Sequence, residues 1–269
     1  MIIKYTAFLD VLGFSNYMKT SITNEEEAEE FHISLKQTVD KYLDGMEKED
    51  IFKNSSHNVT YLHDIQLEYS WISDTFVVSL KYDLNIKQED IYLKPTMIHY
   101  LSSIVSQINH FFVMEYQLCL RGAITSKFTY LKDRILLGKG IAEAHELESK
   151  IASNPRVIFA SDIITDEINN ILNEDLNSCI LKDCDGWYFI DFFNLLKESP
   201  PVIYIDEDWR LKNTDKSEDE LLVCIMDETM KRYENMINKN LLKHKDNQVV
   251  LAKYLWLKEY YEKKNENEK

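Results

Sequence analysis

Hydrophobic positions at the start of the chain predict a buried strand followed by two helices. Residues 2–9 are apolar with few interruptions and end at Asp10, a pattern typical of a buried strand. A short turn follows, and Ser15 is placed to cap a short helix after it. Thr23 and Glu26 have the spacing of a capping box, so they predict the start of a longer helix.

The middle of the chain alternates between strand-like and helical periods. It predicts strands over 65–72, 75–81, 117–125 and 155–160, helices over 95–116 and 138–152, and a hairpin over 128–137. This order mixes parallel and antiparallel pairing. It is typical of a ferredoxin-like α+β palm, in which helices lie mainly on one face of a central sheet. A Rossmann fold would need a Gly-rich first turn and regular alternation of strands and helices, and the sequence has neither.

The C-terminal part is richer in helical patterns. They predict a helix capped by Ser161, a strand over 187–190, and helices over 218–243 and 247–264. Polar stretches over 50–62 and 206–217 predict loops. We therefore expect a core over residues 1–165 and an α-rich extension over residues 166–269 that packs on the same domain.

Charge narrows the range of partners. The chain has 46 Asp and Glu residues against 31 Lys and Arg residues, a net charge of −15. Such a surface repels nucleic-acid backbones and anionic lipid, so we expect no nucleic-acid partner and no membrane docking, although a local basic site stays compatible with it. The sequence has no signal-peptide pattern and no apolar run of ~18 residues. Its cysteines are scattered, as reduced thiols are, so we expect a cytoplasmic protein.

Two aspartates stand where a metal ion could be held. Asp10 ends the first predicted strand, and Asp74 lies in the turn between two predicted strands. A first strand and a hairpin are commonly neighbours in a palm sheet, so the two carboxylates could meet at one edge. Carboxylate oxygens together with a backbone carbonyl suit Mg²⁺ or Mn²⁺. The alternative is that both are ordinary turn residues, although an aspartate in the apolar surroundings of Asp10 needs a charge partner.

The turn after Asp10 is a candidate phosphate-binding element. It consists of Leu12, Gly13, Phe14 and Ser15 and leads from a strand into a helix. Exposed backbone N–H groups in such a turn can bind phosphate. Every strand–turn–helix junction has such amides, so the turn points to phosphate only together with its neighbours.

Several motifs together resemble those of the class III nucleotidyl cyclases, the family of adenylate and guanylate cyclases. Phe8–Ser15 is similar to their first metal motif, and Ser73–Ser79 to their second metal hairpin, which usually has Gly-Asp. Leu120–Thr125 occupies the place of the next core strand, Gly138–Ser149 resembles the dimerisation and catalytic helix, and Pro155–Ile158 matches the closing strand. The motifs follow one another in family order along the predicted core.

A closer resemblance is to a bacterial subgroup, because Asp185–Asp191 and Lys253–Leu257 are similar to its Asp-Gly strand and its C-terminal Lys-Tyr-x-Trp-Leu. The pyrimidine cyclases of the Pycsar antiphage system are related to this subgroup. The resemblance implies that UTP, or next CTP, is converted to the 3′,5′-cyclic monophosphate and pyrophosphate. The product would be a second messenger in antiphage defence that activates an effector encoded nearby. It also implies a homodimer with sites shared across the interface.

The resemblance further implies roles for individual residues. Two Mg²⁺ or Mn²⁺ ions would be held by Asp10, Asp74 and the Val11 carbonyl, and would bind the triphosphate. The base-contacting positions of the family align with Ser70 and Ile135, which lack the Lys and Asp of adenine selection.

One helix departs from the family pattern. Ala142 and Glu146 stand where the family has a ribose-orienting Asn and a transition-state Arg. The candidate cations in their place are Arg121, Lys127, Lys139 and Arg134. Arg121 has the alternative of pairing with a structural carboxylate. These departures keep a second hypothesis open, a catalytically silent cyclase-fold dimer that binds a nucleotide or a protein. A third is an enzyme that links nucleotides into cyclic oligonucleotides.

Overall fold

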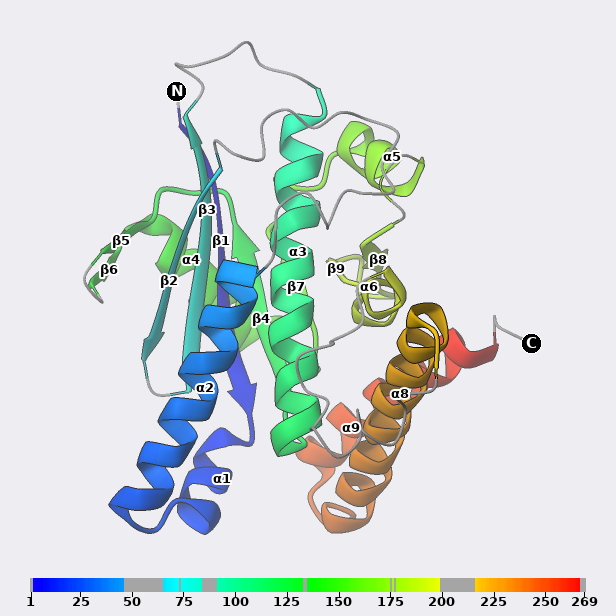
Figure 1. Cartoon of the computed structure of the whole chain (residues 1–269). Coiled ribbons are helices and arrows are strands. Elements are labelled where there is room, and N and C mark those ends of the chain that lie inside the picture. The colour runs from blue at the N-terminus through cyan, green and yellow to red at the C-terminus, as the bar shows by residue number, and fades with distance from the viewer. Residues whose placement is uncertain are drawn as a thin grey trace.

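One sheet of seven strands runs through the molecule, in the order β2-β3-β1-β4-β7-β9-β8 (Figure 1). A computed structural model places residues 2–45, 65–72, 74–83, 91–132, 135–174, 176, 178–198 and 216–266, and the statements below concern these residues. The strands are β1 (Ile2–Leu12), β2 (Gln66–Ile72), β3 (Thr75–Asp83), β4 (Cys119–Thr125), β7 (Val157–Phe159), β8 (Ile180–Lys182) and β9 (Tyr188–Ile190). A separate hairpin pairs β5 (Tyr130–Lys132) with β6 (Ile135–Leu137), as predicted for 128–137.

The first four strands have the ferredoxin-like arrangement. β1 pairs antiparallel with β3 on one side and with β4 on the other, and β2 pairs antiparallel with β3. α1 (Phe14–Ser21) and α2 (Glu25–Gly45) join β1 to β2, and α3 (Leu93–Phe111) joins β3 to β4. A β-α-β-β-α-β chain with the order β2-β3-β1-β4 is ferredoxin-like, so the predicted α+β palm is confirmed.

The remaining helices complete the two faces of the sheet. They are α4 (Lys139–Lys150), α5 (Asp166–Glu174), α6 (Phe192–Glu198), α8 (Glu218–Lys243) and α9 (Gln248–Glu266), and a π-helical turn over Phe112–Tyr116 continues α3. Figure 1 shows α2 and α3 on one face and α4 on the other. None of the helices within the placed ranges has the length and apolarity needed to cross a bilayer.

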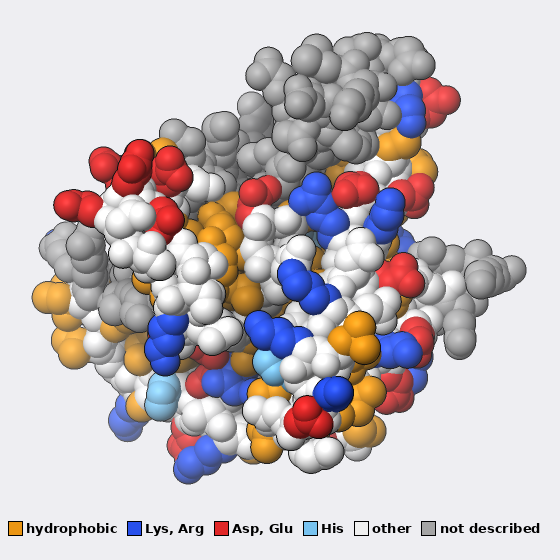
Figure 2. Space-filling model, turned by 90° about the horizontal axis from the view of Figure 1, so that it is seen from below, with side chains coloured by type: hydrophobic (Ala, Val, Ile, Leu, Met, Phe, Trp, Pro, Cys, Tyr) orange, Lys and Arg blue, Asp and Glu red, His pale blue; other side chains and the backbone are white. Residues whose placement is uncertain are grey.

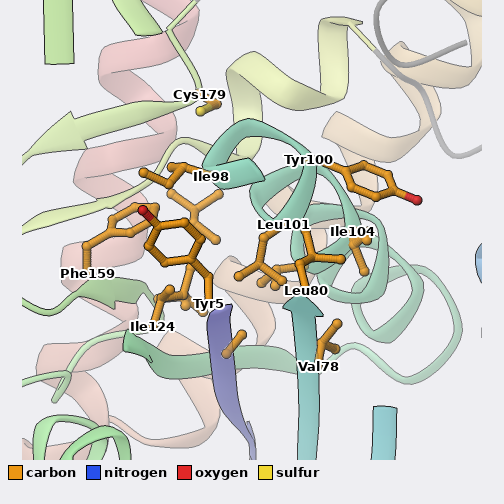
Figure 3. Packing of buried hydrophobic residues seen from close by; sticks show 14 of the residues in the cluster. Tyr5, Val78, Leu80, Ile98, Tyr100, Leu101, Ile104, Ile124, Phe159 and Cys179 are labelled. Carbon is orange, nitrogen blue, oxygen red and sulfur yellow. The ribbon is translucent and has the colours of Figure 1, made fainter. Parts of the chain in front are cut away.

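Alternate residues of each strand form two cores. Tyr5, Ile124 and Phe159 point from the strands toward Ile98 and Leu101 of α3 (Figure 3). The opposite face buries a second cluster, in which side chains of the sheet and of α4 meet α8 and α9. Its members include Phe8, Ile158, Phe189, Tyr233, Leu257 and Tyr260. The C-terminal segment thus supplies both β8 and β9 of the sheet and two helices that pack against it.

The N-terminal boundaries differ from the predicted ones. β1 does not end at Asp10 but continues to Leu12, because Asp10 and the residues after it still pair with β4. α1 begins at Phe14, with Gly13 rather than Ser15 at its N-cap. The cap of α2 is one residue later than predicted, since the N–H of Glu27 donates to the side chain of Asn24.

Short elements were harder to predict. The helix expected after Ser161 begins at Asp166 instead, because a turn intervenes and the Thr165 hydroxyl accepts from the N–H of Ile168 at 3.3 Å. β8 and α6 were not predicted at all, since three- and seven-residue elements carry little periodic signal. The predicted loop over 50–62, and that over 206–217 up to residue 215, lie outside the placed residues.

Candidate active site

The sheet brings Asp10 and Asp74 together from distant parts of the sequence. Asp10 lies opposite Thr75 in the β1–β3 ladder, and the N–H of Val11 donates to the carbonyl of Asp74 at 3.1 Å. Both aspartates are partly exposed. Asp10 and Asp74 are therefore neighbours in the sheet, as the predicted hairpin led us to expect.

Arg121 is the charge partner that Asp10 was expected to need. The two residues are opposite each other in the β1–β4 ladder, and Nε of Arg121 donates to Oδ2 of Asp10 at 2.8 Å. The Arg121 Nη2 lies 2.6 Å from Oε1 of Glu148, a buried residue of α4. Arg121 is thus held between two carboxylates, which is the structural pairing considered from the sequence.

Glu148 and Lys253 of α9 extend this pair into a cluster of alternating charge. Burial raises the pKa of the Glu148 carboxyl, and the nearby Arg121 opposes that rise without cancelling it. Burial is also the main cause that lowers the pKa of Lys253, with Arg121 adding to the effect and Asp10 and Glu148 opposing it. Sequence reasoning missed both residues. The signals that could have found them are the Leu-Glu ending of the α4 motif, which contains Glu148, and the C-terminal Lys-Tyr-x-Trp-Leu motif, which begins at Lys253.

The donor set of Asp10 and Asp74 fits a hard divalent cation. Mg²⁺ is usually held by one or two carboxylates, waters and the phosphates of a substrate rather than by a cage of protein ligands. Among the placed residues, no group of three or more His, Cys, Asp or Glu side chains could hold a metal ion. Arg121 engages one carboxylate oxygen of Asp10, so an incoming cation would share Asp10 with it.

In the candidate phosphate turn, Gly13 and Ser15 are exposed, Leu12 is half-buried and Phe14 is buried. Gly13 is exposed with φ of +85°, and it begins α1 without a capping side chain. Phe14 is buried and packs against the rings of Phe31 and Trp71, at centroid distances of 5.6 and 6.0 Å. Leu12 and Gly13 also line a cavity of about 680 Å³ that α1, α8 and α9 enclose.

The other cation candidates lie elsewhere in the same chain. Lys127 follows the far end of β4, where Thr125 is opposite Thr6, and its Nζ is 2.5 Å from Oε1 of Glu143. Lys139 is the first residue of α4, at the opposite end from Glu148. Within one chain the fold therefore does not bring Lys127 and Lys139 to Asp10. Arg134 lies outside the placed residues.

The predicted base-contacting residues differ in their surroundings. Ser70 of β2 is 6 % exposed, and its hydroxyl has no hydrogen-bond partner among the placed residues. Ile135 of β6 is 52 % exposed. On α4, Glu146 is exposed and pairs with Lys150 at 2.6 Å.

Two further motifs from the sequence have structural roles. The buried Arg156 pairs with Asp183 and Asp185, and its guanidinium lies over the ring of Trp256, 5.8 Å from the centroid. The Asp-Gly turn and the C-terminal Trp motif therefore meet at one arginine that joins β7 to α9. His145 packs edge-on against Phe8 at 5.7 Å, in keeping with the packing interpretation.

Comparison with known proteins adds little to this picture. No family model matches the chain, and no curated protein matches its sequence. Among solved structures, the dimeric guanylyl cyclase domain of the RhoGC fusion protein from the aquatic fungus Blastocladiella emersonii is similar with a TM-score of 0.35 and 11 % identity. The match covers 71 % of this chain and 97 % of that chain. A likeness of this size is too small to assign a function.

Proposed function

We propose that this protein is a metal-dependent nucleotidyl cyclase. The observation that carries the proposal is the nearness of Asp10 and Asp74 in a ferredoxin-like sheet, beside a turn in which Gly13 begins α1 without a side-chain cap. The motifs in family order along the core support the same reading of the fold. The favoured substrate is UTP, followed by CTP.

In the proposed reaction, the ribose 3′-oxygen attacks the α-phosphorus of the same nucleotide. The new bond closes the 3′,5′-cyclic monophosphate, the bond to the β-phosphate bridging oxygen breaks, pyrophosphate leaves, and the hydroxyl proton passes to solvent. Asp10, Asp74 and the Val11 carbonyl would hold two Mg²⁺ or Mn²⁺ ions, which supply activation of the hydroxyl and neutralisation of the phosphates. The amides of the 12–15 turn would orient the triphosphate.

The proposal extends to assembly and biological role. Exposed apolar side chains on the β5–β6 hairpin support a homodimer, which would bring Lys127 and Lys139 of one copy toward the site of the other. The cyclic nucleotide would act in the cytoplasm as a second messenger of antiphage defence and activate an effector encoded nearby.

Incubation of the purified chain with each of the four NTPs and Mn²⁺, followed by mass spectrometry, tests the proposal. We expect cyclic UMP or cyclic CMP from the wild type, and at least ~100-fold less from Asp10→Asn or Asp74→Asn because the metal loses a charged ligand. Glu174→Gln, on the distant helix α5, is the matched control and keeps activity. Absence of any cyclic product from the wild type, or unchanged product from Asp10→Asn, would reject the proposal.

The alternative is a silent cyclase-fold dimer that binds a nucleotide. It is supported by Arg121, whose charge is already taken by Asp10 and Glu148, and by Ala142 and Glu146 on α4. Metal-dependent binding of an NTP without turnover would favour it. Linked dinucleotide products would instead indicate an oligonucleotide cyclase.

A further inference from the structure

A cavity of about 680 Å³ opens at the end of the sheet where β1 finishes and β4 begins. α1 forms one wall, α8 and α9 form the other, and the π-helical turn closes the space between them. The volume is in the range of small-molecule sites. Figure 2 views the molecule from this end and shows Lys and Arg side chains gathered over the middle of the face.

The cavity lies next to the candidate active site. Leu12 and Cys119 line it and are opposite each other in the β1–β4 ladder, and the next pair on the same face of the sheet is Asp10 with Arg121. Residues two apart in a strand are separated by about 7 Å. Lys253 also lines the cavity while interacting electrostatically with Asp10, Arg121 and Glu148.

The cavity lining has a charge opposite to that of the whole chain. Lys239, Lys243 and Lys253 line it, whereas Glu115 is the only acidic residue among its lining residues. Lys239 donates to the neutral amide of Gln117 at 2.8 Å. Among the placed residues no carboxylate forms an ion pair with Lys239 or Lys243. In a chain of net charge −15, three lysines around one cavity favour an anionic ligand.

The fourth basic residue of the lining is His244. Its ring is parallel to that of Tyr254, and the two ring centroids are 6.2 Å apart. Burial and the neighbouring Lys243 lower the pKa of His244. This shift favours the neutral imidazole, so the three lysines are the main source of positive charge in the cavity.

We propose that this cavity binds the polyphosphate group of a nucleoside triphosphate, with Lys239, Lys243 and Lys253 of the C-terminal helices as the phosphate-binding cations. The proposal rests on the proposed function only in placing the reacting nucleotide at Asp10. It gives α8 and α9 a role in the site, and it supplies cations from these helices where α4 has Ala142 and Glu146.

Calorimetric titration of the full chain with inorganic tripolyphosphate tests the cavity without requiring turnover. Lys239→Ala combined with Lys243→Ala should weaken binding at least tenfold. The matched control is Lys231→Ala with Lys245→Ala, which removes the same charge from exposed positions of α8 and of the following turn outside the cavity. Equal affinity in both double variants, or no binding by the wild type, would overturn the proposal. Should the cavity double variant not fold, Lys243→Gln serves, with a smaller loss of affinity expected.

A kinetic experiment separates this proposal from the proposed function. If the wild type makes a cyclic nucleotide, the cavity double variant should raise KM for the NTP at least fivefold, and an unchanged KM would reject the cavity while leaving the cyclase in place. If no NTP is converted, but tripolyphosphate binds and the lysine variants lose it, the cyclase proposal fails and the polyphosphate site stands.

Discussion

At the scale of single residues, the candidate site is a row of alternating charges. Arg121 lies between Asp10 and Glu148, and Lys253 approaches the same group from α9. A buried charge without a partner is costly, so each member of the row holds the next. A cation that arrives at Asp10 must therefore compete with Arg121, whereas a phosphate must compete with Asp10 and Glu148 for Arg121. Ligand binding is thereby coupled to the position of the Arg121 side chain.

His110 is the clearest pH-sensitive group outside the site. It is fully buried in α3, where Nδ1 contacts the Tyr233 hydroxyl at 2.9 Å and Nε2 contacts the Ser106 hydroxyl at 3.0 Å. Burial lowers the pKa of His110 to about 3. Between that value and an unfolded pKa of about 6.5, the unfolded chain binds the proton and the folded chain does not. Stability is therefore lost as the pH falls through this window.

We expect this one histidine to remove about 2 kcal/mol of unfolding free energy between pH 7 and pH 5. Urea unfolding of the wild type and of His110→Gln over this pH range measures it, because the variant should show a shallower decline by that amount. His32→Gln, at an exposed position of α2, is the matched control and keeps the buried imidazole. Parallel pH profiles of the wild type and His110→Gln would contradict the assignment.

At the scale of elements, Gly122 sets how closely β4 approaches β1. A Cβ atom at this position would overlap the carbonyl oxygen of Phe8 and crowd the backbone of Leu9. These contacts are backbone atoms of a central strand and cannot move aside. Since Arg121 and Asp10 face each other in the same ladder, this spacing also positions the candidate site.

Gly122→Ala should therefore destabilise the protein by about 3 kcal/mol. Gly186 provides a matched comparison, because a Cβ there meets nothing within 4 Å and only the φ of +88° opposes it. We expect Gly186→Ala to cost about 1 kcal/mol. Chemical denaturation of both variants checks the order, and equal costs would show that the β1–β4 spacing is not limiting.

The elements with long periodic patterns, and the nearness of Asp10 and Asp74, could be predicted from the sequence. Local patterns were enough for both, because a hairpin that pairs with the first strand brings the turn that contains Asp74 next to Asp10. The motifs that contain Glu148 and Lys253 did not place these residues beside Arg121, because their approach to Arg121 depends on how α4 and α9 dock on the sheet. Docking is decided by tertiary packing, which leaves no signature within a window of neighbouring residues.

At the scale of the whole molecule, the distribution of charge matters more than its sum. The net charge of −15 disfavours polyanions over the general surface, while the lysines of α8 and α9 face a cavity beside Asp10. A small, highly charged anion can enter such a cavity, whereas a long nucleic acid would meet the acidic surroundings. Under the proposal of a polyphosphate site, the C-terminal helices combine two roles, packing on the sheet and supplying positive charge to the cavity.

Assembly is the property of the whole molecule that the proposed function most depends on. The hairpin exposes four large apolar side chains, namely Phe128, Tyr130, Ile135 and Leu137, with Phe128 71 % exposed. Clusters of this kind are uncommon on monomers and mark contact surfaces. We expect the wild type to sediment as a dimer and Phe128→Asp combined with Leu137→Asp to sediment as a monomer, because two carboxylates cannot be buried there.

Leu242→Asp combined with Val249→Asp is the matched control for this experiment. These residues are equally apolar and 76 and 73 % exposed, but they lie on α8 and α9, away from the hairpin. The control should remain dimeric in sedimentation-velocity runs at the same concentrations. A monomeric wild type, or a dimer that persists in the hairpin variant, would contradict an active site shared through the hairpin. Lys127 and Lys139 could then not reach the Asp10 of a partner through this interface. Activity measured in the same samples then shows whether a single chain is active. If the monomeric hairpin variant keeps full activity, every cation that the reaction requires, including those of the lysine-lined cavity, comes from one copy.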